Sequence, residues 1–135
     1  MDANLHEALK WLKQGEKDLV SSGNSSKSSD YEWSCFQAQQ SAEKVLKSIL
    51  YAKGYRKILT HSVFDLIREI NKFDPSFMDL KKEAKVLDGV YITARYPDSI
   101  VGDLIPSEYF EKEDAEECIR CAELICNRVK NSLRT

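Results

Sequence analysis

The sequence predicts an all-α fold, a five-helix up-and-down bundle. Apolar residues recur every three or four positions along five segments, which is the spacing of a buried helix face. No stretch keeps the alternating pattern of a strand for more than a few residues. The chain has 3 Pro and 5 Gly, a low content that favours helices. Its 135 residues suit one domain spanning residues 1–135.

The first helix is predicted over residues 2–19, with an apolar face that includes Leu5, Leu9 and Leu12. Gly15 lies near this face, so another helix can approach closely there. Residues 21–29 are small or polar without an apolar side chain, and we expect a mobile loop.

The second and third helices are predicted over residues 30–52 and 62–72. Ser29 with Glu32, and Ser62 with Asp65, have the spacing of N-terminal capping pairs. Gly54 is a natural stop after the second helix.

A fourth helix is predicted over residues 76–94, starting at a Ser76–Asp79 capping pair and ending before Pro97. Residues 96–106 contain two prolines and a glycine and should be irregular. The last helix is predicted over residues 107–132, with acidic residues at its start and basic residues at its end, as the helix dipole favours.

Composition excludes several classes of function. The net charge is −2, with no basic arm for DNA binding. No apolar run is long enough for a membrane span and no signal peptide is visible, so we expect a cytoplasmic protein. Cys118 and Cys121 form a C-x-x-C inside a helical pattern, but a second ligand pair for zinc is missing. We therefore expect buried thiols, no metal and no cofactor.

One face of the second predicted helix is polar. Gln40, Glu43 and Lys44 are interleaved with its apolar positions. This pattern is typical either of a solvated helix edge or of a polar groove that faces a ligand or a twofold partner.

The segment from Tyr91 to Asp98 is the densest local signal. An arginine at a helix end can bind a phosphate or a carboxylate with two parallel hydrogen bonds. Asp98 could instead hold the Arg95 guanidinium in an internal clamp, and the sequence leaves both interpretations open. The spacing of His6 and His61 predicts no catalytic assembly.

Together these segments resemble the HEPN (higher eukaryotes and prokaryotes nucleotide-binding) domains. Residues 35–44, C-F-Q-A-Q-Q-S-A-E-K, look like the second-helix pattern C-x-x-x-Q-Q-x-A-E-K of that family. His61-Ser62 followed by Leu66 is similar to the start of its third helix, and residues 95–98 match its R-Y-P-D segment. The resemblance covers residues 8–133.

The resemblance implies a homodimer that associates with nucleotides or RNA, often beside a small nucleotidyltransferase, as in toxin–antitoxin pairs. One branch of the family consists of ribonucleases with an R-x(4–6)-H motif. Counted from Arg95, the positions for that histidine are Ile100, Val101 and Gly102, so we expect no ribonuclease activity.

The function expected from the sequence is a non-catalytic nucleotide-binding or dimerisation module. The alternatives are a degenerate ribonuclease of the toxin type and a purely structural interaction protein. In the expected site, Arg95 and Lys44 contact phosphate oxygens while Gln40 and Glu43 contact the base or ribose, provided that Asp98 leaves Arg95 available.

Overall fold

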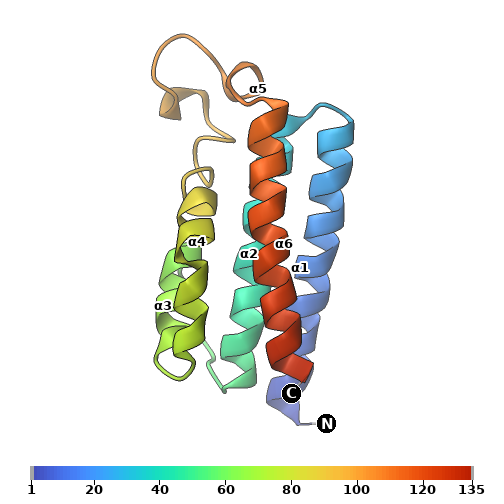
Figure 1. Cartoon of the computed structure of the whole chain (residues 1–135), viewed down its shortest axis with the longest axis vertical. Helices are drawn as coiled ribbons and strands as arrows, with labels where there is room; N and C mark the ends of the chain where they lie inside the picture. Colours follow the sequence, from blue (N-terminus) through green and yellow to red (C-terminus); the bar gives the residue numbers. More distant parts are fainter. Residues whose placement is uncertain (1, 135) are drawn as a thin grey trace.

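The computed structural model describes residues 2–134 and confirms an all-α bundle (Figure 1). These residues contain no β-strand. The helices are α1 (Ala3–Lys27), α2 (Tyr31–Ala52), α3 (Val63–Asn71), α4 (Lys81–Asp88), α5 (Pro106–Tyr109) and α6 (Lys112–Arg134), with 3-10 turns η1 (Pro75–Leu80) and η2 (Pro97–Ser99). The sixth helix arises because the last predicted helix, over residues 107–132, is divided into the single-turn α5 and the long α6. No helix among residues 2–134 has both the length and the apolarity needed to cross a membrane.

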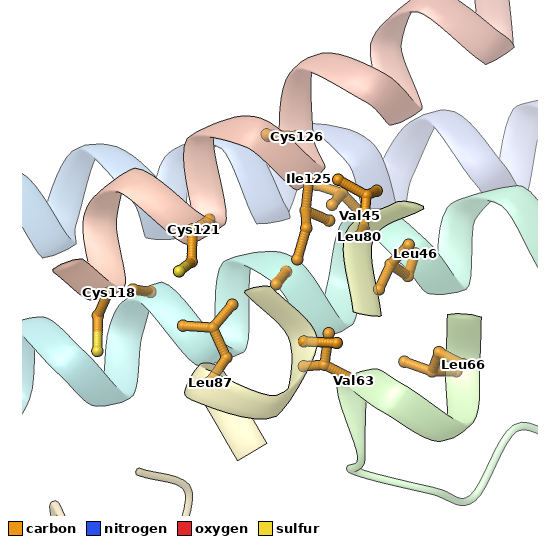
Figure 2. Close-up of a cluster of buried hydrophobic side chains, with 14 of the residues drawn as sticks. Val45, Leu46, Val63, Leu66, Leu80, Leu87, Cys118, Cys121, Ile125 and Cys126 are labelled. Atoms are coloured by element: carbon orange, nitrogen blue, oxygen red, sulfur yellow. The ribbon is translucent and has the colours of Figure 1, made fainter. Parts of the chain in front are cut away.

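Helix α2 lies at the centre of the bundle and packs against α1, α3 and α6. Val45 and Leu46 of α2 meet Val63 and Leu66 of α3 and Ile125 of α6 in the main hydrophobic core (Figure 2). Burying side chains of this size contributes about 1.5–3 kcal/mol each. The core therefore fixes α2 as the frame on which the other elements are placed.

Helix α1 is longer than predicted, because the expected mobile loop at residues 21–29 is helical as far as Lys27. Ser22 is fully buried, and it exchanges hydrogen bonds with Ser34 of α2: each hydroxyl donates to the other residue's carbonyl, at 2.7 and 2.9 Å. Ser25 also donates to the Gln37 side chain. Small hydroxyl side chains thus join two closely packed helices here, and the loop prediction was wrong.

The close approach predicted at Gly15 is confirmed. A methyl group added there would lie 2.5 Å from Val45 Cγ1 and 3.1 Å from the carbonyl oxygen of Ser41. The Ser41 hydroxyl donates to the Gly15 carbonyl at 2.7 Å. Helices α1 and α2 can pack this closely only because residue 15 has no side chain.

The predicted caps have mixed outcomes. Ser62 caps α3 as expected, because its hydroxyl accepts from the Asp65 amide at 3.1 Å. Ser29 does not cap α2: it has a left-handed φ of 64° and precedes Asp30, which makes no side-chain cap bond. The Ser76–Asp79 pair does not start a helix: residues 75–80 form a 3-10 turn whose first residues are capped by the Asp74 side chain.

The fourth predicted helix is interrupted. Residues 75–80 form η1, and α4 ends at Asp88. The Asp88 carboxylate accepts from the Val63 and Phe64 amides and the Ser62 hydroxyl, at 2.6, 3.1 and 2.8 Å. It thereby caps the neighbouring helix α3, and the chain continues from Gly89 to Arg95 as turns.

The last predicted helix begins later than expected. Phe110 lies between α5 and α6 with an extended backbone, which separates the two helices. Its side chain inserts into the core, and only 6% of the residue is exposed. Helix α6 then starts afresh, with the Asp114 carboxylate accepting from the Glu111 amide at 2.8 Å.

Candidate functional site

Arg95 lies at the end of the turns that follow α4 and is surrounded by aromatic rings. Its guanidinium carbon is 4.4 Å from the ring centre of Phe36, 4.6 Å from that of Tyr91 and 5.0 Å from that of Tyr96. Its Nε donates to the Tyr91 carbonyl at 3.0 Å. Cation–π contacts and this hydrogen bond hold the half-buried side chain in place.

The Arg95–Asp98 clamp considered from the sequence does not form. Within residues 2–134, no ion pair within 4.0 Å involves Arg95. The terminal nitrogens of the guanidinium therefore have no acidic partner and are available to an anion.

A buried polar network on α2 lies beside this cluster. Glu43 and Lys47 form an ion pair at 2.9 Å, although only 5% and 4% of these residues are exposed. Glu43 Oε2 also lies 3.2 Å from His61 Nδ1. Gln39 donates to Glu43 Oε1 and to the His61 carbonyl, at 3.3 and 2.9 Å. A buried ion pair is costly unless it is well bonded, and here the carboxylate has three partners.

His61 connects the network to Arg95. Its ring stacks on Tyr91 with 5.3 Å between ring centres and 15° between planes. Since His61 and Arg95 both contact the Tyr91 ring, they lie within about 10 Å of each other. The His61 side chain is 56% exposed, and with Nδ1 at the carboxylate its Nε2 remains for a ligand.

Two aromatic side chains of this region are exposed. Tyr96 is 48% exposed and Trp33, which packs edge-on against Phe36, is 49% exposed. Large rings at the surface beside an arginine are typical of sites that stack nucleobases. We call Phe36, His61, Tyr91, Arg95 and Tyr96 the arginine–aromatic cluster.

The structure brings together some of the predicted site residues. Glu43 contacts His61, and Gln40 borders the network by donating to Gln39 at 2.8 Å. Lys44 donates to Gln40 Oε1 at 3.4 Å, and it also pairs with Asp18 of α1 and lines a shallow hollow with Trp11. Asp98 is exposed in η2, three residues after Arg95.

The sequence does not single out His61 as a residue of the site. It precedes a helix cap, and nothing in its local pattern distinguishes it from a solvated residue. Its contact with Glu43 joins residues 18 positions apart, which no helical spacing encodes.

The four cysteines are buried free thiols. A hydrogen bond with Cys35 and burial raise the pKa of Cys118 well above its ordinary value, and burial raises that of Cys121 to about 12. In residues 2–134, no group of three or more Cys, His, Asp or Glu side chains is arranged to hold a metal ion.

Comparison with known proteins shows the family to which this chain is similar. The HEPN domain model matches residues 8–132. A Methanocaldococcus jannaschii protein named "Putative toxin MJ1304" is 30% identical over 97% of this chain and 91% of its own length. Human sacsin is 23% identical over 95% of this chain, which spans only 3% of sacsin. The crystal structure of TT1696 from Thermus thermophilus is 35% identical, with a TM-score of 0.86 over 92% of this chain and 96% of that one.

Proposed function

Because the chain belongs to the HEPN domain family, we propose that it is a non-catalytic nucleotide-binding module whose ligand contacts Arg95. The observation that carries the proposal is the Arg95 guanidinium, which is held among three aromatic rings and has no acidic partner within 4.0 Å among residues 2–134. A cation fixed in place in this way loses little side-chain freedom on binding an anion.

The chemistry of the cluster suits a nucleotide. The terminal nitrogens of Arg95 can donate to two phosphate oxygens, and charge-assisted hydrogen bonds of this kind contribute about 1.5–3 kcal/mol each. Tyr96 and Trp33 offer exposed ring faces on which a base can stack. His61 Nε2 supplies a further polar contact at the edge of the same site.

Glu43 takes a positioning role in this proposal. Its carboxylate holds His61 Nδ1, while Lys47 balances its charge from the buried side. The local repulsion of an anionic ligand is thereby reduced. Gln40 would contact the ligand at the border of the network, and Lys44 and Asp98 would be outer members of the site.

The proposal is tested by isothermal titration calorimetry with AMP, with adenosine as the probe that lacks phosphate. We expect Arg95→Gln to weaken AMP binding at least tenfold. Arg68→Gln is the matched control, since Arg68 also lies over a ring, that of Phe64, but pairs with Asp65 on α3. No AMP binding by the wild type at millimolar concentration, or equal binding by Arg95→Gln, would contradict the proposal.

The two histidines of the chain allow a direct test of the His61 contact. In an NMR titration with AMP, the imidazole resonances of His61 should shift while those of His6 on α1 stay in place. His61→Gln assigns the two sets of signals. Shifts confined to His6 would remove His61 from the site and leave the Arg95 test unaffected.

The M. jannaschii relative is named as a toxin. Because one branch of the HEPN family consists of ribonucleases, the second candidate function is a toxin-type ribonuclease. Acid–base catalysis needs a positioned proton-transfer group, and the pair of His61 and Glu43 could supply one. We nevertheless expect no RNA cleavage, because the histidine of the R-x(4–6)-H motif is missing. Cleavage that survives purification and is lost in both Arg95→Gln and His61→Gln would favour the enzyme.

We further propose that the chain forms a homodimer and partners a small nucleotidyltransferase. Light scattering should give twice the 15.5 kDa of one chain at tens of micromolar protein. A nucleotidyltransferase encoded beside it should co-purify at a fixed ratio when the two are co-expressed. A monomer mass, or separate elution of the two proteins, would contradict these assignments.

A further inference from the structure

The two ends of the bundle carry opposite charges that form no ion pair in the part of the chain that the structure describes. Residues 96–111, which we call the acidic arch, contain four acidic and no basic residues; residues 53–59, the basic loop, contain three basic and no acidic residues. Within residues 2–134, none of these seven charges takes part in an ion pair. The arch lies at one end of the bundle and the loop joins α2 to α3 near the other (Figure 1). The charges are Asp98, Asp103, Glu108 and Glu111 in the arch, and Lys53, Arg56 and Lys57 in the loop.

Both segments also expose large apolar side chains. In the acidic arch, Val101 is 98% exposed and four neighbours are between 44% and 51% exposed: Tyr96, Leu104, Ile105 and Tyr109. In the basic loop, Leu59 is 84% exposed. Apolar side chains gathered in this way and bordered by charge are typical of a surface that binds another protein.

The acidic arch borders a hollow that could receive an apolar side chain. Its volume is about 410 Å³, and Asp114 lies on its lining. Apolar residues of the arch, of α4 and of the turns after α4 supply much of the wall: Val86, Val90, Ile100, Val101, Tyr109 and Phe110. The hollow and the arch together are thus complementary to Leu59 and the cations beside it.

We propose that the basic loop of one copy docks against the acidic arch of a second copy, with Leu59 in the hollow. The inference rests on the proposed homodimer and specifies its contact surfaces. Two antiparallel copies related by a twofold axis make this contact twice and leave neither surface free, so the assembly closes as a dimer. The contact joins opposite charges that form no ion pair among the described residues of one chain, which favours this orientation over a parallel one.

The apolar part of the contact is tested by Leu59→Asp, with Val20→Asp as the matched control. Val20 is 57% exposed on α1, outside both surfaces. In sedimentation velocity experiments, Leu59→Asp should raise the dissociation constant of the dimer at least tenfold and Val20→Asp should leave it unchanged. If Leu59→Asp forms a dimer as stable as that of the wild type, the proposed contact is wrong but the proposed homodimer stands. If the wild type is a monomer, both the contact and the homodimer are wrong.

Charge reversal tests the electrostatic part. The double variants Arg56→Glu/Lys57→Glu and Asp98→Lys/Asp103→Lys should each be mainly monomeric. When mixed they should form a heterodimer, because both contacts then join opposite charges again. Lys13→Glu/Lys17→Glu on α1 gives the same change in net charge as the first double variant and should remain dimeric. Failure of the mixture to associate, or a mass that keeps growing with concentration, would overturn the proposed closed contact.

Discussion

Two glycines of α1 should respond to the same substitution with opposite signs. An alanine methyl at position 15 would meet Val45 Cγ1 at 2.5 Å, and it would also lie 3.1 Å from the Ser41 carbonyl oxygen and 3.2 Å from the Val45 amide nitrogen. At Gly23, an added methyl has no neighbouring atom within 4 Å. Both residues lie inside the helix, so both substitutions give the same gain in helix propensity.

The space around each glycine determines how far alanine changes the free energy of unfolding. Replacing glycine by alanine in a helix gains about 0.8–1 kcal/mol. Overpacking a core contact costs about 1–3 kcal/mol, and the upper part of that range applies at Gly15 because two of the three contacts are to backbone. We therefore expect Gly15→Ala to lower the free energy of unfolding by about 2 kcal/mol, and Gly23→Ala to raise it by about 0.5–1 kcal/mol.

Urea denaturation followed by circular dichroism measures both changes. In thermal denaturation, Gly15→Ala should lower the melting temperature by about 7 °C for a domain of this size. Gly23→Ala serves as the control for the propensity gain and should melt slightly above the wild type. A Gly15→Ala protein as stable as the wild type would show that α1 and α2 are not held this close together.

Two further outcomes follow from buried groups. Lys47→Met should lower the free energy of unfolding by about 3–5 kcal/mol, because the buried Glu43 carboxylate loses its cation. In urea denaturation, the double variant Lys47→Met/Glu43→Gln should recover most of this loss. A double variant that is no more stable than Lys47→Met would contradict the ion-pair argument. The pKa of Cys121 is raised from 9.0 to about 12 in the folded chain, so above pH 9 the unfolded state releases a proton that the folded state keeps. The free energy of unfolding should therefore fall between pH 9 and 12, less steeply in Cys121→Ala, and equal slopes for the two proteins would refute the assignment.

Much of the fold could be predicted because its signals are local. The Ser62 cap depends on residues three positions apart, and the central α2 depends on a regular apolar face. The tight packing at Gly15 could be predicted because a glycine on an apolar helix face leaves room for the backbone of a neighbouring helix.

The errors come from tertiary contacts that override local preference. A run of serines is typical of a loop, yet Ser22 and Ser25 each find a partner on α2 and the helix continues to Lys27. Asp88 fits a helix interior, yet its carboxylate caps α3 and the helix ends there. In both cases the deciding partner lies at least 12 residues away in sequence.

The candidate site shows the same division between local and distant signals. Arg95 could be found from its segment alone, but the sequence predicts Tyr91 inside a fourth helix over residues 76–94. Since α4 ends at Asp88, the following turns place Tyr91 between His61 and Arg95, and its ring links the two groups. The Asp88 carboxylate that ends α4 also caps the helix that follows His61. The position of the proposed ligand contacts therefore depends on one tertiary cap, which couples the fold of the bundle to the geometry of the site.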